Sequence, residues 1–95
     1  MTYRLSDKAD DDLLLILLES LDRFGAAQAA RYRASTEHAF YLIARHPEIA
    51  RLRTEVSPPV RAFPHPPHLI LYDVEADGSV LVQRIRHGRE DWMAE

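Results

Sequence analysis

The sequence of 95 residues has no cysteine, only three glycines and no cluster of metal ligands. Without cysteine there is no disulfide framework and no thiolate metal site, which fits a reducing compartment. The three glycines are well separated, so a glycine-rich phosphate loop is excluded. His65 and His68 are three residues apart, but a proline-rich turn separates them, which is weak spacing for a metal site. We therefore expect no metal and no other cofactor.

Long hydrophobic segments are also missing. The longest apolar run is six residues, Leu13 to Leu18, whereas a helix that crosses a bilayer needs roughly 20. The first residues, Met1 to Leu5, lack the apolar core of an export signal. We therefore expect a cytoplasmic protein that does not enter a membrane.

Positive charge is not in excess, since the formal net charge is −3. Proteins that coat nucleic acids draw binding energy from Lys and Arg, so this balance argues against direct nucleic-acid binding. The distribution is uneven, with acids led by Asp7 and Asp10 near the start and more Arg than acids between Arg45 and Arg89. Both a basic face on an acidic protein and a solvated mixed surface fit this pattern.

The N-terminal part predicts a strand followed by a helix, within one domain that spans residues 1–95. Tyr3 to Leu5 is a short strand candidate, and Ser6 is suited to be the N-cap of the helix that follows. Acidic residues in the first turns complement the positive end of the helix dipole. The helix is predicted from Asp7 to about Arg23, and Gly25 ends it because glycine tolerates left-handed backbone conformations.

A second helix is predicted from Ala26 to about His46, where Pro47 stops it. Its apolar face recurs at steps of three or four residues: Ala29, Tyr32, Thr36, Phe40 and Ile43. Because the junction at Gly25 is short, the two helices should form an antiparallel hairpin.

After Pro47 the pattern changes from helical to extended. Residues 48–57 are predicted to be a polar connector, followed by strands at Val60–Phe63, His68–Val74 and Val80–His87. Alternation in the last strand places Val80, Val82, Arg84 and Arg86 on one face and Leu81, Gln83, Ile85 and His87 on the other. The predicted fold class is α+β, with an N-terminal strand, an antiparallel two-helix hairpin and a three-stranded antiparallel β-meander.

The run Leu13 to Leu18 makes the first helix apolar nearly all round for almost two turns. One side can pack on the sheet or on the second helix. The other side is either wedged between them or covered by another chain, because contiguous exposed apolar surface marks interfaces. We favour the second interpretation.

The last predicted strand runs into a segment crowded with Arg, His, acids and Trp. Cleavage of RNA through its 2′-OH needs a general base, a general acid and cations for the phosphate. Arg61 and Arg84 would hold the phosphate and His87 would transfer the proton, with Glu55 the only nearby carboxylate base. The structural alternative, which we prefer, is that Arg84 pairs with a sheet carboxylate, Arg61 lies on the surface and His87 caps the strand.

Motifs from Tyr3 to Trp92 form an ordered series. Those in the predicted helices are Leu5-Ser6, Ala9, Asp12-Leu13, Ile16, Phe24-Gly25, Gln28-Ala29, Tyr32, Phe40 and Ile43-Ala44-Arg45-His46-Pro47. Those in the predicted sheet are Val60-Arg61, His68-Leu69-Ile70, Tyr72 and Arg84-Ile85-Arg86-His87-Gly88-Arg89-Glu90-Asp91-Trp92. Together they resemble the ParE/RelE superfamily, the toxin halves of bacterial type II toxin–antitoxin modules. The ending His87-Gly88-Arg89-Glu90-Asp91-Trp92 favours the ParE branch over RelE.

The resemblance implies two helices against an antiparallel sheet and a cognate antitoxin that wraps the toxin in a hetero-oligomer. ParE-type toxins are understood to inhibit DNA gyrase by binding, without enzymatic activity. RelE-type toxins cut mRNA and are usually strongly basic, so the net charge of −3 supports the ParE branch. The alternatives are an mRNA-cleaving ribonuclease that uses Arg61, Arg84 and His87, and a binding module of the same fold that has lost toxicity.

Two sets of contact residues follow from this interpretation. We expect Arg84, His87, Arg89 and Trp92 to face the target. We expect Leu14, Leu17, Leu18 and Leu21 to contact the antitoxin, as a helix in a groove or by strand addition.

Overall fold

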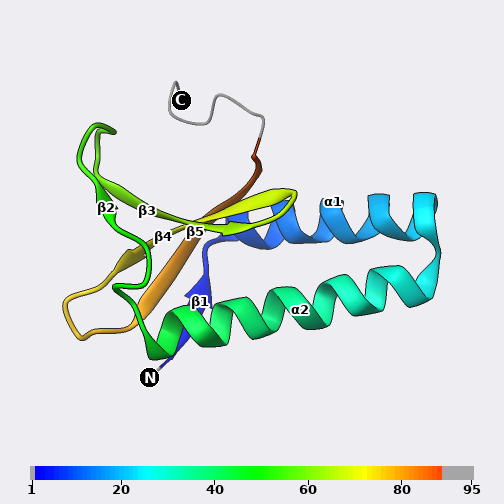
Figure 1. The fold of residues 1–95 in the computed structure, drawn as a ribbon, viewed down its shortest axis with the longest axis horizontal. Coiled ribbons are helices and arrows are strands. Elements are labelled where there is room, and N and C mark those ends of the chain that lie inside the picture. The colour runs from blue at the N-terminus through cyan, green and yellow to red at the C-terminus, as the bar shows by residue number, and fades with distance from the viewer. Residues whose placement is uncertain (1, 89–95) are drawn as a thin grey trace.

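The structure is a computed structural model that describes residues 2–88. Its elements in chain order are β1 (Tyr3–Leu5), α1 (Asp7–Phe24), α2 (Ala26–Arg45), β2 (Leu52–Arg53), β3 (Val60–His65), β4 (His68–Val74) and β5 (Val80–His87). The two helices form an antiparallel hairpin that packs on one face of a single sheet (Figure 1). The predicted α+β fold class is therefore confirmed.

Both ends of α1 follow the predicted capping. The Ser6 hydroxyl accepts a hydrogen bond from the Ala9 N–H at 3.0 Å, which satisfies one of the unpaired donors of the first turn. Gly25 has a φ of 88° and donates its N–H to the Leu21 carbonyl at 3.0 Å. Helix α1 thus ends one residue after the predicted Arg23, and α2 ends at Arg45, one residue before the predicted His46.

The sheet has five strands in the order β1-β5-β4-β3-β2, of which only the β1–β5 pair is parallel. The prediction that residues 48–57 are only a connector is wrong, since Leu52–Arg53 pairs with the start of β3. A two-residue edge strand is too short to show an alternating pattern. Strand β3 also continues past its predicted end at Phe63, through Pro64 to His65. Proline is tolerated there because β2 has ended and that edge of β3 needs no donor.

A β-bulge in β5 changes which residues face the helices. Leu71 of β4 pairs with Arg84 and the next residue, Tyr72, pairs with Val82, so Gln83 is an extra residue in β5. The predicted alternation is therefore wrong beyond Val82. Ile85, and not Arg84, continues the row of Val80 and Val82 in the core.

The main core lies between the sheet and the parts of the helices nearest to it. Its largest fully buried side chains include Phe40 and Ile43 of α2, Ile70 and Tyr72 of β4. The predicted face of α2 is confirmed at Thr36, Phe40 and Ile43, which are buried, whereas Ala29 and Tyr32 are half-buried. The reason is that the tip of the hairpin projects beyond the sheet (Figure 1), and residues 21–28 are all exposed.

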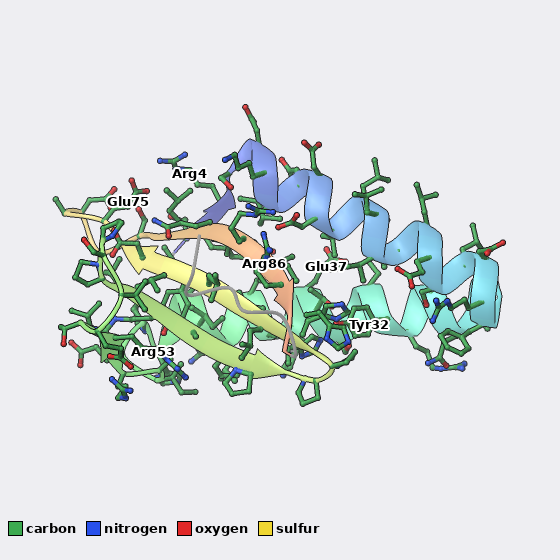
Figure 2. All side chains as sticks on the ribbon, turned by 90° about the horizontal axis from the view of Figure 1, so that it is seen from above. Arg4, Tyr32, Glu37, Arg53, Glu75 and Arg86 are labelled. Carbon is green, nitrogen blue, oxygen red and sulfur yellow. The ribbon has the colours of Figure 1, made fainter. Side chains whose placement is uncertain are left out.

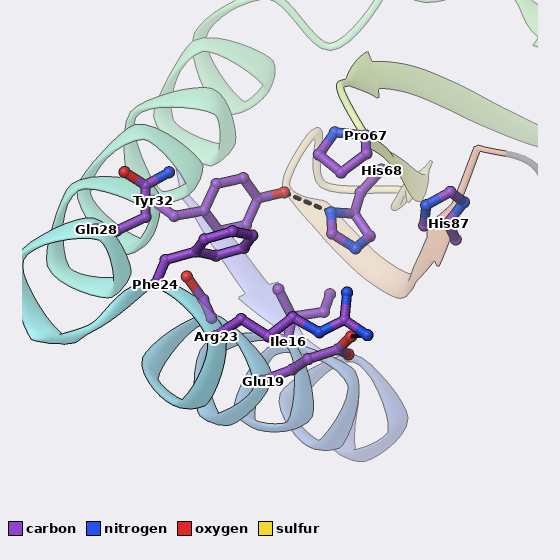
Figure 3. Close-up of a pocket in the computed structure, with 10 residues that line it drawn as sticks. Ile16, Glu19, Arg23, Phe24, Gln28, Tyr32, Pro67, His68 and His87 are labelled. Atoms are coloured by element: carbon purple, nitrogen blue, oxygen red, sulfur yellow. Dashed lines mark hydrogen bonds and ion pairs between the residues drawn. The ribbon is translucent and has the colours of Figure 1, made fainter.

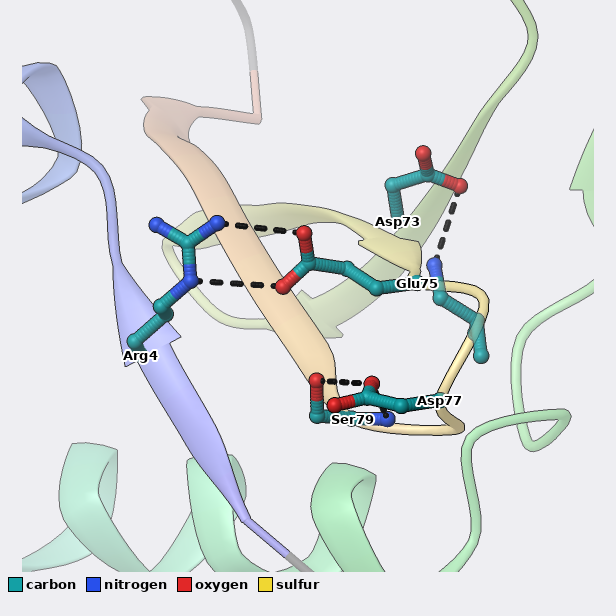
Figure 4. A network of polar contacts seen from close by, with 6 residues as sticks. Arg4, Asp73, Glu75, Asp77 and Ser79 are labelled. Atoms are coloured by element: carbon teal, nitrogen blue, oxygen red, sulfur yellow. Dashed lines mark hydrogen bonds and ion pairs between the residues drawn. The ribbon is translucent and has the colours of Figure 1, made fainter.

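The two ends of the sheet differ in character. In Figure 2, Arg4 and Glu75 lie at one end of the sheet and Tyr32 lies towards the other, where the hairpin projects. The Arg4 guanidinium donates to both Glu75 carboxylate oxygens, at 3.2 and 3.1 Å (Figure 4). Asp77 accepts hydrogen bonds from the N–H and hydroxyl of Ser79, which lower the pKa of Asp77 and form the predicted turn between β4 and β5.

Candidate functional site

Arg84 is joined to a carboxylate of helix α1. Its Nε and Nη2 atoms donate to the two oxygens of Asp12, at 2.8 and 3.1 Å, and the Ile85 N–H donates to the same carboxylate at 2.9 Å. Burial alone would raise the pKa of Asp12, but the hydrogen bonds from Arg84 and Ile85 outweigh it and lower that pKa. The prediction that Arg84 pairs with a sheet carboxylate is therefore wrong, because its partner is on a helix.

Asp12 binds a part of the β5 edge that has no strand partner. Strand β1 pairs with β5 only as far as Val82, so the backbone beyond it has no strand partner on that side. Ser6 donates its N–H to the Val82 carbonyl at 2.9 Å and its hydroxyl to the Gln83 carbonyl at 2.7 Å. Further along the same edge, the Asp12 carboxylate accepts the Ile85 N–H. Ser6 and Asp12 thus make the hydrogen bonds that a neighbouring strand would otherwise make.

Arg61 also has a structural contact. Its Nη1 donates to the Ala50 carbonyl, and the side chain is half-buried and not the surface residue that we predicted. Nearby, the Tyr72 hydroxyl donates to the Pro47 carbonyl at 2.7 Å and accepts from the Ala50 N–H at 3.4 Å. Burial raises the pKa of Tyr72. Arg61 and Tyr72 together hold the segment that follows α2 against the sheet.

The three residues of the ribonuclease hypothesis do not come together. Arg61 lines a hollow near the end of α2, whereas His87 lines a different pocket beside the hairpin, and Arg84 is held by Asp12. Glu55, the candidate base, forms an ion pair with Arg51 at 2.9 Å, and hydrogen bonds from Arg51 lower the pKa of Glu55 to about 2. A carboxylate of such low basicity is a poor general base at neutral pH.

Three histidines form a row across the ends of β3, β4 and β5. His65 and His68 are cross-strand partners, and so are His68 and His87. His65 Nε2 lies 3.2 Å from the Thr36 hydroxyl of α2, and burial lowers the pKa of His65. The Tyr32 hydroxyl lies 2.6 Å from His68 Nδ1 (Figure 3). Both His65 and His68 therefore contact α2. We call His65, His68 and His87 the histidine row.

The sequence predicted only His87 of this row as a site residue. The register of the strands brings His68 next to it, with ring centroids 5.7 Å apart in an edge-to-face arrangement. The signal that could have indicated the row is that His68 and His87 lie at predicted strand ends and His65 lies two residues beyond the predicted end of a third strand. Tyr32 gave no such signal, because its spacing in α2 fits an ordinary core position.

A pocket of about 290 Å³ lies between the projecting hairpin and the histidine row. Its lining combines aromatic, apolar and charged side chains, among them Ile16, Arg23, Phe24, Tyr32, His68 and His87 (Figure 3). Arg23 also forms an exposed ion pair with Glu19, at 3.3 Å. The pocket thus has flat rings on its walls and the Arg23 guanidinium close by.

The apolar excess of α1 is largely exposed to solvent. Leu14, Leu18 and Leu21 are 57%, 51% and 48% exposed, and Leu17 is half-buried. These four residues follow the i, i+3, i+4, i+7 spacing of one helical stripe, which we call the leucine stripe. The residues predicted for antitoxin contact thus form one continuous surface.

Three further predictions concern two target-contact residues, metal binding and membrane insertion. Arg89 and Trp92 lie outside the described residues. Within residues 2–88, no group of three His, Asp or Glu side chains is arranged to hold a metal ion. Over the same residues, neither helix combines the length and the apolar character that crossing a bilayer requires.

Similarity to known proteins identifies the family of this chain. A family model described as the ParE toxin of the type II toxin–antitoxin system, parDE, matches residues 3–92. This chain belongs to the ParE toxin family. It is 34% identical over 89 residues to the proteins called Toxin ParE1 from two strains of Mycobacterium tuberculosis, CDC 1551 / Oshkosh and ATCC 25618 / H37Rv. Each alignment covers 94% of this chain and 91% of the relative.

A solved structure agrees with the fold. The chain is similar to the chromosomal ParDE TA system from P. aeruginosa, with a TM-score of 0.77 and 18% sequence identity. The match covers 92% of this chain and 95% of the other. The predicted membership of the ParE branch is therefore confirmed, and the chain is the toxin component of a type II toxin–antitoxin system.

Proposed function

We propose that this ParE-family toxin inhibits DNA gyrase by binding it, does not cut RNA, and is neutralised by a cognate antitoxin in a hetero-oligomer. The absence of RNA cleavage is supported by the separation of the candidate ribonuclease residues, and gyrase inhibition by membership of the ParE toxin family. Arg84 forms an ion pair with Asp12, and Arg61 and His87 line different hollows of the described structure. Phosphoester cleavage needs these groups within hydrogen-bond reach of one phosphate.

The C-terminal motif supplies the proposed target contacts. Arg84 contributes indirectly, because its ion pair with Asp12 fixes β5 against α1. His87, at the end of β5, is the last strand residue before Gly88, whose N–H donates to the Pro67 carbonyl at 2.8 Å. Arg89 and Trp92 follow directly in the sequence. We propose that His87, Arg89 and Trp92 contact the target.

One experiment separates the candidate functions. The purified toxin is assayed for inhibition of gyrase supercoiling and, in parallel, for cleavage of ribosome-bound mRNA. We expect supercoiling to be inhibited and the mRNA to remain intact. Cut mRNA that becomes intact with His87→Ala would refute the proposal in favour of the ribonuclease. A toxin inert in both assays and harmless on expression would instead indicate a binding module that has lost toxicity.

We also propose that the antitoxin covers the leucine stripe with an apolar helix. Large exposed leucines in contiguous positions are unusual on a protein without a partner. The stripe begins next to the acidic first turn of α1, at Asp7 and Asp10. A partner helix with apolar residues at the same spacing and a basic end over that turn would complement both features.

Leu18→Gln tests this surface. Leu18 is 51% exposed, so the variant should fold, and losing its burial at an interface should weaken antitoxin binding about tenfold or more. Leu52→Gln is the matched control, because Leu52 is 41% exposed but belongs to β2, at the opposite edge of the sheet from β1. Titration calorimetry measures both variants. Equal affinities for Leu18→Gln and Leu52→Gln would contradict the proposed location.

A further inference from the structure

The pocket beside the histidine row has features, apart from His87, that the proposed gyrase and antitoxin contacts do not use. It lies between the projecting part of the hairpin and the ends of β4 and β5 (Figure 3). We propose that this pocket binds a mononucleotide, with the base against its aromatic wall and the phosphate at its imidazole and guanidinium groups. This inference goes beyond the proposed function and does not depend on it.

The aromatic wall provides a surface for a base. Phe24 is 66% exposed at the end of α1, although it lines the pocket. The Tyr32 ring faces the same pocket from α2, and Ile16 and Pro67 add apolar surface. Nucleic-acid bases stack on aromatic side chains whatever their identity, since every base has a π-face. A volume of about 290 Å³ lies at the lower end of the range for ligand sites, which suits a ligand of about the size of one nucleotide.

The charged groups provide the site for a phosphate. His68 and His87 lie side by side, and Arg23 lines the same pocket. Burial raises the pKa of Tyr32, so this hydroxyl stays protonated and can donate to His68 Nδ1. The neutral His68 ring then carries its proton on Nε2, which makes that nitrogen a donor.

An ion pair sets the charge balance of the pocket. Glu19 is the carboxylate among the lining residues, and its ion pair with Arg23 leaves the two together without net charge. The imidazoles of His68 and His87 line the same pocket as this ion pair and offer ring nitrogens as further hydrogen-bond donors for a phosphate.

The net charge of −3 does not contradict this site. A coat on a nucleic-acid strand needs many cations, because its affinity comes from many phosphates. A single nucleotide needs only a local cluster of donors and a stacking surface. The inference therefore concerns a small molecule and not a nucleic-acid polymer.

The test is a titration of the full chain followed by NMR of the five histidine imidazoles. The probes are adenosine monophosphate, uridine monophosphate, adenosine and inorganic phosphate. We expect both nucleotides to shift the His68 and His87 resonances, and adenosine and phosphate to bind at least about tenfold more weakly.

Two variants and one control locate the site. His87→Gln should weaken nucleotide binding about tenfold by removing the ionisable ring. Phe24→Ala should weaken it by a similar factor, and Phe24 is exposed enough that the fold does not need it. His38→Gln changes an exposed histidine of α2 and should leave affinity unchanged.

Three results would overturn the inference. The first is the absence of resonance shifts at millimolar nucleotide. The second is nucleotide binding that neither His87→Gln nor Phe24→Ala alters, and the third is phosphate binding as tight as nucleotide binding. Because the measurement uses the toxin alone, a negative result here leaves the gyrase assay unaffected, and a negative gyrase result leaves this site unaffected.

Discussion

Asp12→Ala tests how strongly the ion pair between α1 and β5 stabilises the fold. The substitution removes the acceptor of three hydrogen bonds, two from Arg84 and one from the Ile85 N–H. A fully buried charge left without its partner costs about 3–5 kcal/mol. The side chains of Arg84 and Asp12 are 28% and 16% exposed, so water reduces that cost. We expect the free energy of unfolding to fall by about 2–3 kcal/mol.

Urea unfolding followed by circular dichroism measures this loss. With an m value of about 1–2 kcal/mol per molar urea, the midpoint should fall by roughly 1–3 M. Glu75→Ala is the matched control, because it also breaks a two-oxygen contact with an arginine, Arg4. That pair is 64% and 33% exposed, so its loss should cost less than about 1 kcal/mol. Equal losses in the two variants would refute the reasoning.

The contribution of Asp12 should also depend on pH with a definite sign. Folding lowers the pKa of Asp12 below its ordinary value of 3.8, so the folded state favours the ionised form. The stabilisation is complete above that ordinary value and is lost as the pH falls through the lowered folded value. The difference in stability between the native chain and Asp12→Ala should therefore shrink below about pH 4. A difference that stays constant from neutral pH to pH 2 would contradict an ionic contribution.

Three further predictions follow from single residues. Tyr72→Phe removes the hydroxyl that bonds Pro47 and Ala50, and should lower the free energy of unfolding by about 1–2 kcal/mol in the same urea assay. Gly25→Ala forces a side chain into a backbone with φ 88° and ψ 173°, which should cost about 1–3 kcal/mol, although no atom lies within 4 Å of the added carbon. The pKa of His65 is lowered by burial, so NMR titration should place it below 6.5. Stability should fall as the pH drops through 6.5 towards that lower value, and His65→Gln should remove this dependence.

The helices could be predicted well because their signals are local. Ser6, Gly25 and Pro47 mark the limits of α1 and α2 through hydrogen-bonding capacity or backbone preference, and each acts within a few residues. The apolar face of α2 was correct where the sheet covers it. It was less accurate at Tyr32, because no periodic pattern shows where a sheet ends beneath a helix.

The features missed by sequence reasoning depend on partners far along the chain. Gln83 is of a residue type that fits a regular strand, and only the register against β4 makes it a bulge. In the sequence, Asp12 resembles an ordinary carboxylate in the first turns of a helix. Its partner Arg84 lies 72 residues later, so the contact depends on the packing of β5 beside α1. Strand β2 is two residues long and is defined by its pairing alone.

The parallel pairing of β1 with β5 has a consequence for the order of events during protein synthesis. Tyr3 aligns with Val80, so β1 cannot pair with the sheet until β5 has been synthesised. Chains fold from the N-terminus while they are made, and the hairpin of α1 and α2 is complete before β4 and β5 exist. During that interval Phe40 and Ile43 have no sheet to cover them, and the leucines of α1 are exposed as well. During translation, a partner that recognises the hairpin therefore has time to bind the toxin before the toxin has folded.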